Sequence, residues 1–321
     1  MNLVELSVVV PVYNEEDNIE ELVRRLSVVL DSTKKTYEVI FVDDGSKDRS
    51  FGMLRICALK NPSFKVIRFN RNYGQHSAIF AGFSHARGDV VVTLDADLQN
   101  PPEEIPKLLH KMEEGYEVVS GYRQNRQDSL CRKIPSFFVA LITSKLVGVQ
   151  LRDYGCMLRA YRKELVRLMC ENSGASTYIP ALANSFASSV TEVSVHHEHR
   201  RRGKSKYGLL SLLRLNFDLM TSFSLLPIQM IGVVGFVMSL FGLGFSLFLL
   251  LMRLVKGSEW AVQGTFTLFG ILFFFVGVQV LSMALIGEYI GRIYQEVRSR
   301  PRYRIQEIFS YATANTPTAP N

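Results

Sequence analysis

The sequence predicts an α/β domain with a mostly parallel sheet, followed by two membrane-spanning helices. Over residues 1–125, short β-branched runs alternate with longer segments whose apolar residues recur at helical spacing, which is typical of a parallel sheet covered on both faces. Residues 219–252 and 260–287 contain no charged side chain. With 47% hydrophobic and 21% charged residues, the 321-residue chain is not a low-complexity disordered protein.

The expected elements of the α/β part follow one another closely along the chain. β-branched and aromatic residues predict strands at 7–12, 37–42, 65–69, 90–94 and 116–122. Helical spacing predicts helices at 15–31, 48–59, 74–86 and 101–114. The last of these opens on Pro101 and Pro102, since proline suits a first helical turn and the acidic Glu103 suits its positive end.

The uncharged segments predict two membrane spans, at 227–254 and 264–287, each long enough to cross a hydrocarbon core of about 30 Å. Lys and Arg flank the first span on its amino-terminal side and the second on its carboxyl-terminal side, which places both chain ends in the cytoplasm. The predicted organisation is a cytoplasmic domain at 1–206, an amphipathic interface helix at 207–226, two membrane helices at 227–287 and a cytoplasmic tail at 288–321. Residues 130–148 form either a second interface helix or a core helix of the domain.

The net charge of +7 comes from 37 Lys and Arg against 30 Asp and Glu. Its basic clusters, at 196–214 and 292–304, flank the uncharged segments, so a lipid bilayer with anionic head groups is the expected partner and nucleic acid is not. The four cysteines form no CxxC motif and no close pair, which favours reduced thiols over a zinc site or a disulfide framework.

Acidic motifs follow three of the predicted strands: VPVYNE at 10–15, VDDGS at 42–46 and LDADLQ at 94–99. The carboxyl ends of parallel strands meet at one crevice, where ligands bind. Asp95 and Asp97 share one face of an extended backbone, and two such oxygen ligands suit Mg²⁺ or Mn²⁺ shared with substrate phosphates. Any one motif could be a turn or a helix cap, but three at equivalent positions favour a nucleoside-diphosphate site.

These motifs resemble those of GT-A glycosyltransferases of family 2, in particular the polyprenyl-phosphate glycosyltransferases. The resemblance continues through NRNYGQHS at 70–77, DYGCMLRAY at 153–161 and RRRGKSKY at 200–207, so it covers nearly the whole chain. It is strongest to members that transfer 4-deoxy-4-formamido-L-arabinose from UDP to undecaprenyl phosphate. It therefore implies a GT-A, Rossmann-like fold and inverting transfer at the cytoplasmic face of the bacterial inner membrane, in lipid A modification and polymyxin resistance.

The resemblance also implies roles for individual residues. The expected nucleotide-binding residues are Pro11, Tyr13, Glu15, Asp44 and Asp95. The expected ligands of Mg²⁺ or Mn²⁺ are Asp95, Asp97 and Gln99. Asp97 and Asp153 are the expected catalytic residues. The expected binders of the acceptor phosphate are Arg123, Arg126, Arg200, Ser205 and Lys206, of which the last three match an RxxGxSK motif.

Three alternatives stay open at this level. A phosphate acceptor has a second pKa of about 6 and is largely ionised, so Asp153 either acts as a base or only positions the reactants. The donor is either the aminoarabinose derivative or another UDP-sugar such as UDP-glucose. A nucleotide-sensing membrane scaffold is disfavoured by the intact DxD motif at 95–97. The resemblance finally implies a homotetramer in which a strand-like tail, 302–308, packs on a neighbouring chain.

Overall fold

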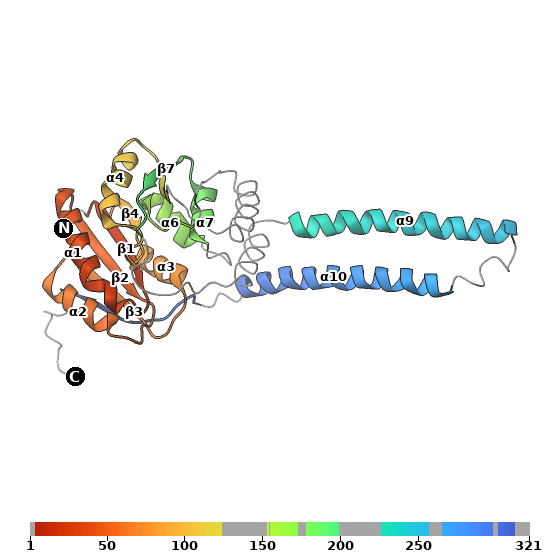
Figure 1. The fold of residues 1–321 in the computed structure, drawn as a ribbon, viewed down its shortest axis with the longest axis horizontal. Helices are drawn as coiled ribbons and strands as arrows, with labels where there is room; N and C mark the ends of the chain where they lie inside the picture. The colour runs from red at the N-terminus through yellow and green to blue at the C-terminus, as the bar shows by residue number, and fades with distance from the viewer. Residues whose placement is uncertain are drawn as a thin grey trace. The chain divides into compact units, whose positions relative to one another are not determined.

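The structure is a computed structural model, and it describes residues 4–123, 153, 155–172, 178–198, 226–256, 265–297 and 301–311. It divides into two compact units (Figure 1). One comprises Met1–Arg214 with Arg300–Asn321, and the other Leu215–Ser299. The segment 130–148 lies outside the described residues, as does 207–226 except for its last residue.

A mixed sheet organises the first unit, and its strand order is β7-β5-β6-β4-β1-β2-β3-β8. The strands are β1 (Leu6–Val12), β2 (Tyr37–Asp43), β3 (Phe64–Phe69), β4 (Val90–Thr93), β5 (Val118–Arg123), β6 (Arg159–Arg162), β7 (Val190–Val195) and β8 (Ile305–Ser310). Pairing is parallel among β4, β1, β2 and β3 and between β5 and β7, whereas β6 and β8 run antiparallel to their neighbours. The mostly parallel sheet is therefore confirmed.

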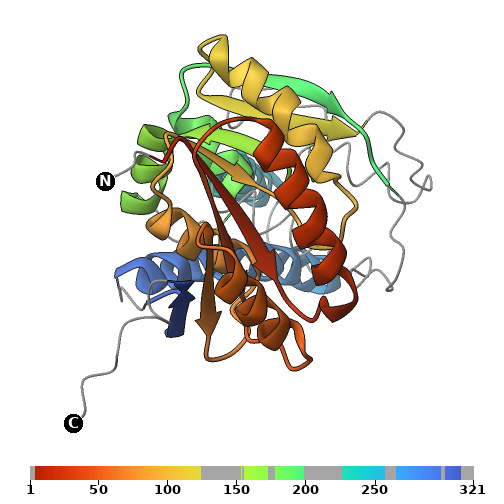
Figure 2. The same cartoon turned by 90° about the vertical axis from the view of Figure 1, so that its left-hand side faces the viewer.

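Helices cover both faces of the sheet (Figure 2). On one face lie α1 (Glu16–Ser32), α2 (Ser50–Lys60) and α4 (Ile105–Glu113), and on the other lie α3 (Gln75–His85), α6 (Lys163–Glu171) and α7 (Ile179–Phe186). Successive side chains of β1 point to opposite faces of the sheet, so Val8 and Val10 pack with the first set of helices and Val9 with the second. The helix expected at 101–114 begins as a 3-10 turn, Pro102–Glu104, before α4.

Helix α3 packs directly on β1 because residue 82 is glycine. A Cβ added at Gly82 would lie 2.2 Å from Cγ1 of Val9, far inside van der Waals contact. This close approach fixes α3 against the centre of the sheet, and its first residue, Gln75, follows the loop that leaves β3.

The tail strand β8 pairs antiparallel with β3 of the same chain, with Lys65 opposite Ser310. The packing of this tail on a neighbouring chain stays a prediction; within the chain, the strand completes the edge of its own sheet. The physical reason lies in its side chains, since Phe309 packs on the core of its own domain and also receives the guanidinium of Arg55, 4.9 Å from its ring centre.

A buried charge cluster ties the amino-terminal edge of the sheet together. Glu38 on β2 is 3% exposed and accepts hydrogen bonds from Ser7 Oγ (2.8 Å) and from the backbone N–H (2.7 Å) and Nε (3.0 Å) of Arg87. Burial by itself raises the pKa of Glu38, but the bonds from Arg87 and Ser7, with the charge of Lys65, hold that pKa below its ordinary value.

Replacing Glu38 by Gln is therefore expected to lower the melting temperature at pH 7 by about 5 °C, since charge-assisted hydrogen bonds are lost. A carboxylate whose pKa is depressed by folding stabilises the fold above its unfolded pKa, near 4.3, and loses that contribution as pH falls through the folded value. The difference between wild type and variant should thus shrink in acid. Thermal unfolding of the purified protein between pH 7 and pH 3 measures this difference in melting temperature. Glu20→Gln, at an exposed position, is the control. A difference between wild type and Glu38→Gln that stays constant with pH would contradict the prediction.

The second unit contains two long helices that contact each other, α9 (Leu226–Lys256) and α10 (Thr265–Val297). Among the described residues, Phe274–Gly291 of α10 is long and apolar enough to cross a membrane, and α9 contains a shorter apolar stretch, Ile228–Gly242. Large apolar side chains stay exposed along both, for example Phe241 at 71% and Phe274 at 58%, which favours apolar surroundings over water. Helix α10 continues well beyond residue 287, the expected end of the second span.

Candidate functional site

The three acidic motifs lie together at the carboxyl edge of the sheet, as the sequence predicts. Strands β1 and β2 end side by side, with Val12 opposite Asp43, and β4 runs parallel beside β1. The backbone N–H of Asp44 donates to the carbonyl of Val12 at 2.9 Å, and that of Leu94 to the carbonyl of Val9 at 3.1 Å. The motifs therefore begin from adjacent strand ends.

Short hydrogen bonds join the first motif to the second. Ser46 Oγ accepts from the N–H of Asn14 at 3.0 Å, and Ser50 Oγ accepts from the N–H of Glu15 at 2.9 Å. The side chain of Asn14 in turn accepts from the N–H of Lys47 at 2.8 Å. This network holds the segment that carries three predicted nucleotide-binding residues, all partly exposed: Pro11, Tyr13 and Glu15.

Asp44, predicted to bind the nucleotide, contacts the loop between β3 and α3. Its side chain is buried, and its two oxygens accept from the backbone N–H groups of Tyr73 (2.6 Å) and Gly74 (2.9 Å). Burial raises the pKa of Asp44, and these two bonds oppose that rise. The next residue, Gly45, has a φ of +68°, and a Cβ there would lie 2.5 Å from the backbone carbon of Arg71. The turn and the loop are thus packed backbone to backbone.

The third motif brings carboxylates close together. Asp95 Oδ1 accepts from Nε2 of Gln75 at 2.5 Å, and Asp97 Oδ1 accepts from the N–H of Gln99 at 3.1 Å. Burial raises the pKa of Asp95 to about 7, with the charge of Asp97 adding to it and the bond from Gln75 opposing it. Gln75 was not predicted as a site residue, although it belongs to the stretch at 70–77 that resembles the family.

This donor set fits a divalent cation. Burial, and after it the charge of Asp97, favour the protonated form of Asp95, and a bound cation would favour its carboxylate form instead. In the described part of the chain, no group of three or more His, Cys, Asp and Glu side chains is arranged to hold a metal ion. Mg²⁺ or Mn²⁺ can be bound by two carboxylates together with substrate phosphates, and Asp95 and Asp97, with Gln99 beside them, supply the two carboxylates.

Arg123 and Asp153, predicted for different roles, form one ion pair. Arg123 ends β5 and donates to Asp153 through Nε at 2.5 Å and Nη2 at 2.9 Å. Asp153 is 3% exposed and also accepts from the N–H of Gly155 at 3.0 Å. β5 ends at the same edge as β4, two strands away, and the charge of Arg123 partly opposes the rise in the pKa of Asp95.

Two further residues at this edge were not predicted. Arg159 on β6 is fully buried and donates to the carbonyls of Cys156 (2.9 Å) and Asp153 (3.3 Å), which holds the segment that carries Asp153. Burial, together with the charge of Asp153, raises the pKa of Cys156 to about 11, so its thiol is not a nucleophile at neutral pH. Both residues belong to the stretch at 153–161, and the resemblance of that stretch to the family was the sequence signal that could have identified them.

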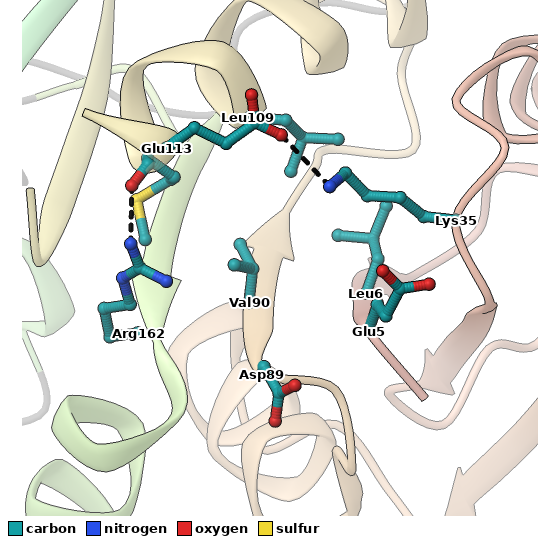
Figure 3. Close-up of a pocket in the computed structure, with 9 residues that line it drawn as sticks. Glu5, Leu6, Lys35, Asp89, Val90, Leu109, Glu113 and Arg162 are labelled. Atoms are coloured by element: carbon teal, nitrogen blue, oxygen red, sulfur yellow. Dashed lines mark hydrogen bonds and ion pairs between the residues drawn. The ribbon is translucent and has the colours of Figure 1, made fainter. Parts of the chain in front are cut away.

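Four predicted acceptor-phosphate residues lie outside the described residues: Arg126, Arg200, Ser205 and Lys206. A hollow of about 180 Å³ lies elsewhere, at the opposite edge of the sheet (Figure 3). There Lys35 Nζ pairs with Glu113 at 3.0 Å, and Arg162 donates to the carbonyl of Met112. It is lined by no predicted site residue.

A GT-A fold whose sheet carries a DxD motif, residues 95–97, at its carboxyl edge is typical of a glycosyltransferase. The sequence matches the family described as Glycosyl transferase family 2 over residues 7–169, and the chain belongs to that family.

Within the family, the chain is similar over nearly its whole length to proteins named undecaprenyl-phosphate 4-deoxy-4-formamido-L-arabinose transferase. The one from Shewanella sediminis (strain HAW-EB3) is 51% identical over 94% of this chain and 92% of its own length. That from Edwardsiella ictaluri (strain 93-146) is 50% identical over 94% of both chains. The resemblance noted from the motifs is thereby confirmed.

Solved structures are more distant. Glucosyl-3-phosphoglycerate synthase from Mycobacterium tuberculosis, in complex with Mn²⁺, uridine-diphosphate and glucosyl-3-phosphoglycerate, is 19% identical with a TM-score of 0.49, covering 68% of this chain and 80% of that chain. Mannosyl-3-phosphoglycerate synthase from Rubrobacter xylanophilus is 13% identical with a TM-score of 0.49, covering 67% and 71%. At this distance we draw no conclusion from them about ligands.

Proposed function

We propose that this protein transfers 4-deoxy-4-formamido-L-arabinose from its UDP donor to undecaprenyl phosphate, with inversion at the anomeric carbon. The observation that carries the proposal is the gathering of the three acidic motifs and the Arg123–Asp153 pair at one sheet edge. The chain that forms this edge is about half identical, over 94% of its length, to relatives whose names state that reaction.

The donor half of the proposed site lies around the first two motifs. Pro11, Tyr13 and Glu15 are partly exposed on the segment after β1 and would contact the uridine. Asp44 would support nucleotide binding, because its carboxylate holds the loop at Tyr73 and Gly74 in place.

Asp95, Asp97 and Gln99 would hold a divalent cation, Mg²⁺ or Mn²⁺, which supplies charge stabilisation for the leaving diphosphate. The protein's own part is to orient the donor so that its anomeric carbon faces the acceptor. A phosphate oxygen of the acceptor forms the new bond as the bond to UDP breaks, and UDP leaves with the electron pair. Because the acceptor is already largely ionised, orientation matters more than proton removal.

Asp153 is proposed as a positioning group near the reacting centre. Its carboxylate receives two bonds from the Arg123 side chain, one from the Arg123 backbone N–H (3.4 Å) and one from Gly155, which favours a fixed anion over a base that must take up a proton. Arg123 then presents positive charge beside the acidic motifs, while Arg126, Arg200, Ser205 and Lys206 are proposed to bind the acceptor phosphate.

The test of the reaction is transfer by the purified full-length protein in vesicles containing undecaprenyl phosphate, with a panel of UDP-sugars and mass spectrometry of the lipid product. We expect the 4-deoxy-4-formamido-L-arabinose lipid in highest yield. Preferred use of UDP-glucose or another donor would contradict the assignment of the donor sugar, but the assignment as a glycosyltransferase would still hold. Light scattering of the detergent-solubilised protein checks the proposed homotetramer.

We further propose that the two long helices cross the bacterial inner membrane and leave the α/β domain in the cytoplasm. A reporter fused after Asn321 is then expected to be cytoplasmic, and one inserted in the 256–259 segment periplasmic, because Lys and Arg flank the pair of helices on the outer sides. Activity of paired alkaline phosphatase and green fluorescent protein fusions measures this. Both positions reporting the same side would contradict two spans.

A further inference from the structure

The residues that precede β8 pack on the end of β3. The ring of Tyr303 stacks on Phe69, with ring centres 4.9 Å apart and planes inclined by 14°. Phe69 in turn meets Tyr73 edge to face at 5.7 Å. The carbonyl of Arg304 accepts from the N–H of Asn70 at 3.3 Å. The tail therefore contacts the loop at 70–74 at its base.

The same loop is attached to the carboxyl edge at its other side. Asp44 accepts from the N–H groups of Tyr73 and Gly74, and the backbone of Arg71 lies against Gly45. The residue after the loop, Gln75, donates to Asp95. The loop is thus a bridge between the tail strand and two of the three acidic motifs.

We propose that Tyr303 is a positioning residue for the donor half of the site. Its ring stacks on Phe69, which in turn contacts Tyr73, and through Phe69 it keeps the loop at 70–74 in the geometry in which the loop backbone contacts Asp44. This inference rests on the proposed function, since the nucleotide bound there is taken to be UDP. Tyr303 follows both long helices in sequence, so the donor half would be complete only once the tail has joined the sheet.

Phe309, which lies in β8 itself, provides a matched control. It is also aromatic and packs on the core, beneath Arg55, where α2 and β8 meet. It pairs in register with Val66, in the interior of β3, whereas Tyr303 stacks on Phe69 at its end. Losing Phe309 should therefore weaken the docking of the strand without altering the loop.

The experiment is calorimetric titration of the purified full-length protein with UDP, beside kinetics with varied donor and varied lipid phosphate. For Tyr303→Ala we expect a Kd for UDP and a KM for the donor raised about three- to tenfold, the loss of one aromatic stack. The kcat at saturating donor and the KM for lipid phosphate should stay within about twofold. Tyr303→Phe retains the ring and should bind UDP as wild type does.

Unchanged UDP affinity in Tyr303→Ala would overturn the proposal, and so would an equal loss in Phe309→Ala, which would show a general effect of strand docking. If Tyr303→Ala does not fold, Tyr303→Leu is judged by the same criteria, because it keeps apolar bulk without an aromatic ring. Absence of UDP binding by the wild type would contradict the proposed function itself and this role with it. Wild-type binding with an unaffected Tyr303 variant would contradict this role alone.

Discussion

Replacing Asp97 by asparagine is expected to lower the rate of transfer at least about 100-fold, because a bound cation contributes several kcal/mol to charge stabilisation and about 1.4 kcal/mol corresponds to tenfold. The carboxylate of Asp97 lies beside Asp95, which it repels, and the substitution removes one of two anionic ligands from that pair. The protein should stay folded, since the asparagine oxygen can still accept from the N–H of Gln99.

Asp89 offers the matched control for this substitution. It precedes β4, whereas Asp97 follows it, and its side chain is exposed at the other end of the strand. Asp89→Asn should leave both transfer and melting temperature unchanged. Turnover rates in vesicles and the binding of Mn²⁺ measured by electron paramagnetic resonance check both variants. Wild-type turnover and Mn²⁺ affinity in Asp97→Asn would contradict the metal assignment.

Replacing Asp153 by asparagine is expected to reduce both stability and transfer. The side chain of Arg123 is only 20% exposed, and the substitution would remove the negative charge that accepts its two side-chain hydrogen bonds. Leaving one charge of a buried pair uncompensated costs about 3 kcal/mol. Transfer should fall about 100-fold, because a small displacement of a positioning group can cost that much.

A double-variant cycle separates these two effects. Arg123→Gln alone should also be destabilised, since it leaves the buried Asp153 charged, whereas Asp153→Asn with Arg123→Gln removes both charges and should recover most of the lost stability. The double variant should remain inactive if the pair positions reactants. Melting temperatures and transfer rates measure the cycle. Full recovery of transfer in the double variant would mean that the pair only stabilises the fold.

Local patterns sufficed for the strands and helices before residue 123, because each buries a continuous apolar face and begins or ends at a turn. They failed for β6. Strand β6 is only four residues long, and its fully buried Arg159 does not look like a core residue.

The order of strands and motifs along the chain is enough to predict that the acidic motifs share one edge of the sheet, because the ends of parallel strands meet there whatever the details of packing. The spacing of Asp95 and Asp97 likewise follows from the backbone alone. Three contacts could be seen only in the folded chain: Arg123 pairs with Asp153, Asp44 binds the loop at Tyr73, and the tail strand completes its own sheet. These contacts join residues far apart in the chain, and their geometry depends on side-chain packing, which leaves no periodic signal in the sequence.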